Sequence, residues 1–285
     1  MQRKRWNSSR DTVDSADRRK AVKESAEQKL NELGDIPNRA GNVRSPPVVN
    51  YKPIMRAFSL LLLAFVLAIS VQGQTTVSFQ TSDGATIFAD VYGSGEKGLV
   101  LAHGGRFNKE SWARQARAFA IAGFHVLAVD FRGYGKSRGP GDSDPLSAPL
   151  HLDVLAGVRY LRERGAKTIS IIGGSMGGSA AGDASIDSQP GEIDRLVLLG
   201  AAPNGPADRL KSPTLYIVAR DDSNADGPRL PRIREQFEKS PQPKKLVVLD
   251  GSAHAQFLFQ TDQAERVMRE ILHFLSARTD TAGSK

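Results

Sequence analysis

A strand-like run that leads directly into a glycine-flanked serine is the feature that most constrains this chain. Residues 168–172, Thr-Ile-Ser-Ile-Ile, favour a strand, and the G-x-S-x-G pentapeptide at 173–177 follows, with small helix-compatible residues after it. A serine at a sharp strand-to-helix turn has a strained backbone, and close neighbouring segments leave no room for side chains at Gly173 and Gly177. The plainer interpretation is a glycine-rich turn with an incidental serine. The strand before and the helix after favour Ser175 as a nucleophile.

A nucleophilic serine needs a base, and only two histidines follow Ser175. His254 ends a strand-like segment and lies in a small-residue loop, where a base can reach over the edge of the sheet. His273 lies in a segment whose apolar residues recur at helical spacing, so we interpret it as a helix residue without a catalytic role. The sequence therefore predicts His254 as the base.

The acid that orients this histidine should follow the strand between the two motifs. Residues 214–220 form a buried-strand pattern that Asp221 and Asp222 close. Two adjacent carboxylates point in different directions, so only one of them can hold the imidazole. Related arrangements place a Gly-x-x-Asp sequence here, and Ala219 takes the glycine position if Asp222 is the acid. We therefore prefer Asp222 to Asp221, and Asp226 is a third candidate.

Two further motifs give the chain a family resemblance. His103-Gly104 follows the strand-like residues 98–102, and residues 130–137 read D-F-R-G-Y-G-K-S. Together with the serine turn and the downstream Asp and His, these resemble the α/β-hydrolase superfamily, in particular its small capless members similar to dienelactone hydrolase. The resemblance implies an oxyanion hole made by the amides of Gly105 and Met176.

The same two loops also suggest structural supports. By the resemblance, His103 hydrogen-bonds loop backbone instead of acting as a base. From the residues themselves, 130–137 form a tight turn in which Asp130 and Arg132 can pair and brace the site from behind.

The order of strand-like and helix-like segments predicts an α/β fold with a mostly parallel eight-stranded sheet, helices on both faces and an antiparallel start. Only residues 200–213 separate two of the strands at the position where many relatives insert a cap domain, so we expect no cap. The expected strands are 75–79, 86–92, 98–102, 125–130, 168–172, 194–200, 214–219 and 245–249, and the expected helices are 110–122, 144–164, 177–187, 228–239 and 262–277.

These features predict a hydrolase domain over residues 74–280 that cleaves small carboxylic esters through an acyl-enzyme, without cofactor or metal. The absence of cysteine excludes disulfides and thiolate catalysis. A catalytically silent scaffold used for binding, and an acyltransferase or peptidase with the same triad, remain alternatives. The partner is a small-molecule ester and not nucleic acid, and the oligomeric state is left open.

The first 73 residues form two further segments. Residues 1–54 carry twelve Lys and Arg against seven Asp and Glu, a net +5 of the chain's +8, and we expect a disordered extension. Residues 57–71 are apolar but short for a membrane span, and Arg56 precedes them. A signal peptide over 55–73 with export of the domain is the preferred interpretation, which would make Met55 the true start; a membrane anchor is the alternative.

Overall fold

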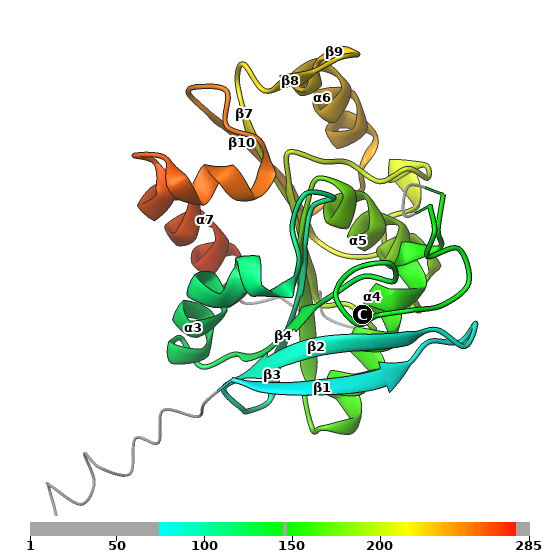
Figure 1. The fold of residues 1–285 in the computed structure, drawn as a ribbon. Coiled ribbons are helices and arrows are strands. Elements are labelled where there is room, and N and C mark those ends of the chain that lie inside the picture. The colour runs from blue at the N-terminus through cyan, green and yellow to red at the C-terminus, as the bar shows by residue number, and fades with distance from the viewer. Residues whose placement is uncertain (1–73, 145–146, 278–285) are drawn as a thin grey trace, which may run out of the picture. The chain divides into compact units, whose positions relative to one another are not determined.

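A computed structural model describes residues 74–144 and 147–277, and its centre is one eight-stranded sheet (Figure 1). The strand order is β1-β2-β4-β3-β5-β6-β7-β10. The strands are β1 (Thr75–Gln80), β2 (Thr86–Tyr92), β3 (Lys97–Ala102), β4 (His125–Val129), β5 (Thr168–Gly174), β6 (Arg195–Leu199), β7 (Thr214–Ala219) and β10 (Lys244–Leu249).

The sheet is parallel except at its start. β2 pairs antiparallel with both β1 and β4, and every other neighbouring pair is parallel. The carboxyl ends of β3, β5, β6 and β7 therefore meet at one edge, where the loops that follow them lie close together. The predicted fold class and the antiparallel start are confirmed.

Helices cover both faces of this sheet (Figure 1). α3 and α7 contribute to the apolar cluster on one face, and α4, α5 and α6 contribute to the cluster on the other face. The helices are α3 (Ala113–Ile121), α4 (Leu150–Glu163), α5 (Met176–Asp187), α6 (Arg229–Lys239) and α7 (Ala264–Ser276), with short 3₁₀ turns η1 (Lys109–Trp112), η2 (Ala207–Arg209) and η3 (Ala255–Gln260).

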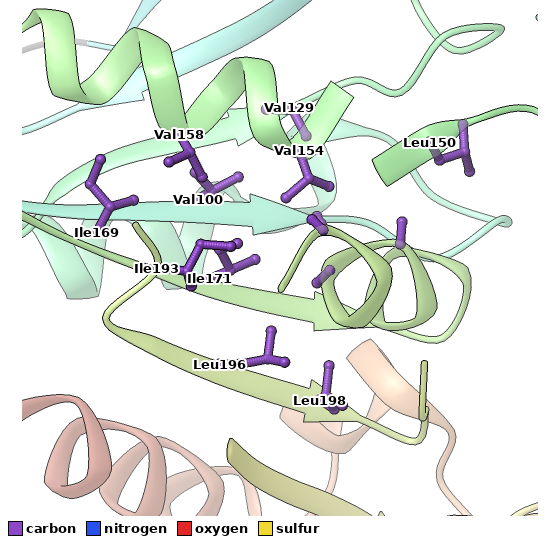
Figure 2. Close-up of a cluster of buried hydrophobic side chains, with 14 of the residues drawn as sticks. Val100, Val129, Leu150, Val154, Val158, Ile169, Ile171, Ile193, Leu196 and Leu198 are labelled. Atoms are coloured by element: carbon purple, nitrogen blue, oxygen red, sulfur yellow. The ribbon is translucent and has the colours of Figure 1, made fainter. Parts of the chain in front are cut away.

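Alternation along the strands explains the two clusters. In β3, Val100 packs toward α4 and α5, while Leu99 and Leu101 belong to the cluster under α3 and α7. Figure 2 shows the α4 side, where Val154 and Val158 lie over the branched side chains of the central strands. Both faces of the central strands are apolar, which is the pattern expected of a buried parallel sheet.

Two local features differ from the sequence-based expectation. α4 begins at Leu150 and not near 144, because Pro149 precedes it as the N-cap and the amides of Ser147 and Ala148 bond instead to Asp144 in a turn. A two-residue hairpin, β8 (Ser223–Asn224) with β9 (Gly227–Pro228), follows β7 and was not predicted.

The connection between β6 and β7 is a loop that contains only the turn η2, so no cap domain is inserted between these strands. Among the helices in the described ranges, none has the length and apolar character needed to cross a membrane. The predicted segments 1–54 and 55–73 lie outside the described residues.

Candidate active site

Ser175 lies in a strained turn between β5 and α5. Its φ of 52° and ψ of −121° are rare for a residue with a side chain. The chain is closely packed around it: a Cβ added to Gly173 would lie 2.3 Å from the Gly177 carbonyl oxygen, and one added to Gly177 would lie 2.4 Å from that of Ala102. The glycines therefore permit the close approach that the turn needs, and the serine hydroxyl projects from the carboxyl edge of the sheet.

His254 joins this serine to an aspartate. Its Nε2 is 2.8 Å from Ser175 Oγ, and its Nδ1 is 2.7 Å from Asp222 Oδ2. A carboxylate only accepts hydrogen bonds, so Nδ1 carries the hydrogen and Nε2 is left to accept the serine proton. The structure thus brings together three residues from the ends of three different strands.

The two adjacent aspartates occupy different environments. Asp222 is completely buried, whereas Asp221 is exposed and does not contact the imidazole. The Asp222 amide donates a hydrogen bond to the Ala219 carbonyl at 3.2 Å, and this turn directs the Asp222 carboxylate inward. His273 is exposed on α7 and lies outside this arrangement.

The two residues expected to supply the oxyanion-hole amides come from separate elements. Met176 is the first residue of α5, where the helix leaves amides without internal acceptors, and Gly105 follows β3. Within the described part of the chain, neither amide donates a hydrogen bond to a protein atom. The hydroxyl of Tyr134 links both residues, donating to the Gly105 carbonyl at 3.0 Å and lying 3.7 Å from Met176 Sδ.

Comparison with known proteins supports the same reading of the fold. A family model described as the alpha/beta hydrolase fold matches residues 98–210. An esterase of Pyrococcus furiosus has a TM-score of 0.59 at 22% identity, covering 83% of this chain and 98% of that one. An esterase from Exiguobacterium antarcticum gives a TM-score of 0.58 at 17% identity, covering 70% and 99%. The chain has the α/β-hydrolase fold.

Relatives found by sequence have higher identity, but their alignments cover only part of each chain. A 2-hydroxy-6-oxononadienedioate/2-hydroxy-6-oxononatrienedioate hydrolase of Burkholderia vietnamiensis is 38% identical over 172 residues, which are 59% of this chain and 56% of the relative. The chain therefore matches about half the length of this curated relative. The solved structures, at their low identity, show the fold alone.

His103, in the loop after β3, is completely buried, and both of its ring nitrogens contact backbone. Nδ1 donates to the Gly104 carbonyl at 2.9 Å, and Nε2 accepts from the Phe131 amide at 3.3 Å. Burial lowers the pKa of His103 to about 4, so the ring is neutral at pH 7. The ring therefore joins the loops after β3 and β4.

The predicted Asp130–Arg132 pair is wrong. Arg132 Nη2 and Nε instead donate to Asp153 of α4, at 2.6 and 2.9 Å, and the guanidinium also contacts Asp83 in the β1–β2 turn. Asp130 accepts the Lys109 amide at 2.7 Å, and burial raises the pKa of Asp130. Asp130 and Arg132 therefore point in different directions, because each binds a partner on a different element.

Gln256 is a site residue that the sequence analysis missed. Its Oε1 accepts the Gly104 amide at 2.7 Å, and its Nε2 donates to Ser111 Oγ at 2.8 Å. The side chain is buried and spans from the histidine loop to the loop after β3. Its position two residues after His254 was the only available signal, since a lone glutamine carries no recognisable pattern.

In the described residues, no group of three or more His, Asp or Glu side chains is arranged to hold a metal ion.

Proposed function

We propose that this protein is a serine hydrolase that cleaves small carboxylic esters through an acyl-enzyme. The observation that carries the proposal is the bridge of His254 between Ser175 and Asp222, at 2.8 and 2.7 Å. A hydroxyl, an imidazole and a buried carboxylate in this order are the elements of an activated nucleophile. The likeness in fold to solved esterases agrees with it.

In the proposed reaction, Ser175 Oγ attacks the ester carbonyl carbon while His254 Nε2 takes its proton. Asp222 holds the required tautomer and stabilises the imidazolium. The proton then passes to the leaving alcohol, and the C–O bond of the ester breaks. Water, deprotonated by the same imidazole, hydrolyses the acyl-serine and restores the hydroxyl.

The oxyanion of each tetrahedral intermediate is assigned to the amides of Gly105 and Met176. Both amides lack a protein acceptor in the described residues, and Met176 stands at the positive end of the α5 dipole. Fixed donors of this kind stabilise charge that develops only during the reaction.

The test is turnover of a chromogenic short-chain ester by the full chain. Ser175→Ala should lower kcat on the order of 10³-fold or more while the protein stays folded, and Ser78→Ala, an exposed serine on β1, serves as the control. A fluorophosphonate probe should label Ser175 in the wild type. Near-normal turnover by Ser175→Ala, or labelling at another residue, would overturn the assignment.

Matched pairs test the other two roles. His254→Ala should cost as much as Ser175→Ala, because the residues act as one unit, and His273→Ala should leave turnover unchanged. Asp222→Asn should reduce turnover far more than Asp221→Asn, because an amide stabilises the wrong tautomer. Equal losses within either pair would contradict the proposed triad.

A second candidate is hydrolysis of a carbon–carbon bond, which the name of the Burkholderia vietnamiensis relative suggests. A panel of esters, thioesters, peptides and a vinylogous 1,5-diketone separates it from esterase activity. Transfer of the acyl group to an added alcohol, which forms a new ester in place of the free acid, would indicate an acyltransferase. An unlabelled Ser175 without turnover would indicate a binding scaffold.

A further inference from the structure

A cavity of about 280 Å³ opens beside Ser175. It lies between the start of α4, the first turns of α5 and the start of α6. Its charged or titratable lining residues are His151, Asp183, Arg229 and Arg232. Two guanidinium groups therefore line the cavity that also holds the candidate nucleophile.

Arg229 is held at the edge of the triad by the β8–β9 hairpin. Its amide donates to the Asp222 carbonyl at 2.8 Å, and its Nε lies 3.3 Å from Asp222 Oδ1. Its side chain is 26% exposed, and among the described residues its buried Nε has no hydrogen-bond partner of good geometry. Asp222 already shares its charge with His254, so Arg229 is only partly neutralised.

Arg232 follows one helical turn later and lines the same cavity. It is exposed, and within the described ranges no carboxylate lies within 4.0 Å of its guanidinium. This side chain is therefore a cation available to a ligand.

The one carboxylate in the cavity lining, that of Asp183, is already hydrogen-bonded. Asp183 accepts the amides of Asn204 and Gly205, both at 2.9 Å, and the Asn204 side chain at 2.8 Å. His151 Nε2 lies 3.5 Å from Asp187. Because the lining carries two guanidinium groups and a single carboxylate, its charge favours the binding of an anion.

We propose that this cavity is a carboxylate subsite, in which Arg229 and Arg232 bind an acid group carried by the substrate. Guanidinium groups match the planar geometry of a carboxylate and can bind it through two parallel hydrogen bonds. This subsite rests on the proposed esterase function. It would restrict the preferred substrates to esters that carry a carboxylate on their acyl or alcohol part.

The experiment compares charged esters with neutral esters of the same length. The 4-nitrophenyl monoester of adipic acid is paired with 4-nitrophenyl hexanoate, which tests the acyl side. 4-Acetoxybenzoate is paired with 4-acetoxybenzamide, which tests the alcohol side. In at least one pair, kcat/KM should favour the charged ester, and the ratio should fall about tenfold in Arg232→Gln. High salt should lower the same ratio.

Arg234→Gln is the matched control, because Arg234 is exposed on the same helix and does not line the cavity. It should keep the wild-type ratio in both pairs. Arg229 is a poorer test, since it also contacts Asp222. A ratio that stays unchanged in Arg232→Gln, or a preference for both neutral esters, would overturn the subsite.

Binding to the Ser175→Ala protein gives a readout that does not require turnover. Monomethyl adipate should bind more tightly than dimethyl adipate by calorimetry, and Arg232→Gln should remove the difference. If neutral esters are turned over and neither assay shows a carboxylate preference, the subsite fails and the esterase function stands. If no ester is hydrolysed but the binding difference persists, the esterase function fails and the subsite stands.

Discussion

At the scale of single residues, the site combines a strained serine with buried groups whose polar atoms have defined partners. His103 illustrates how burial fixes a protonation state. It is completely buried, and Nδ1 and Nε2 are already used by the Gly104 carbonyl and the Phe131 amide. A second ring proton would have to displace the Phe131 amide, which only donates. The neutral ring is therefore part of the folded structure.

We expect His103 to make stability depend on pH. Its pKa is about 4 in the folded protein against 6.5 in the reference state, so between these values the unfolded chain binds a proton that the folded chain excludes. The free energy of unfolding should fall as pH drops from 6.5 to 4, by about 3 kcal/mol from this group. Urea unfolding of wild type and His103→Asn at several pH values measures it.

The variant should be less stable at pH 7 and show a shallower loss toward pH 4, because other acidic groups still titrate in both proteins. Parallel curves for the two proteins would mean that His103 does not contribute this dependence.

The residue scale also shows where sequence reasoning succeeds. Ser175 and His254 were identifiable because the turn and the loop that hold them leave local patterns of glycine and small residues. The partners of Arg132 and the role of Gln256 were not, because the groups they bind lie on elements far away in sequence. Strands with apolar runs were predicted almost to their ends. The helix expected from residue 144 instead begins at Leu150, because Pro149 stands at its N-cap.

At the scale of elements, the site is held by ties between loops. Gln256, in η3, joins the histidine loop to Gly104, and the next residue, Gly105, supplies one of the proposed oxyanion amides. Tyr134, from the loop after β4, contacts the Gly105 carbonyl from the other side. The loop after β3 is thus held by two side chains that come from two different elements.

Gln256→Ala should lower kcat about 10- to 100-fold with a smaller change in KM, because the oxyanion amide loses its support while the cavity is unchanged. Gln256→Glu should restore much of kcat, since a carboxylate oxygen can still accept the Gly104 amide. Gln260→Ala, exposed at the end of η3, is the control. Steady-state kinetics on one ester decides; equal changes in KM and kcat without rescue would indicate a general structural effect.

Arg132 ties three elements together behind the site. Its guanidinium and the Asp153 carboxylate are both fully buried, and the same arginine lowers the pKa of Asp83 to about 2. Asp153→Ala should lower the free energy of unfolding by about 3–5 kcal/mol, because it leaves a buried charge without its main partner. Urea unfolding at pH 7 provides the measurement.

The control variant is Glu96→Ala, which removes an exposed salt bridge with Lys167. It should lower the free energy of unfolding by no more than about 1 kcal/mol. Similar losses for the two variants would contradict the structural role assigned to Arg132.

At the scale of the whole molecule, the first described residues are already attached to the sheet. Gln74 Nε2 donates to Asp90 Oδ2 at 2.6 Å, and Thr76 donates to Asp90 Oδ1 at 2.8 Å. Lys109 Nζ lies 3.1 Å from the same carboxylate, which is completely buried. A chain that began at Gln74 would keep every one of these contacts.

We therefore predict that the protein is exported and that its mature chain begins near Gln74. The apolar residues 57–71, the preceding Arg56, and Val71 and Gly73 at the exit fit a cleaved signal peptide whose small-residue site directly precedes Gln74. N-terminal sequencing of protein from the native host should find Gln74 or a residue close to it, and Val71→Arg should block processing. A mature chain that retains 57–71 would favour a membrane anchor instead, and one that also retains 1–54 would exclude translation from Met55.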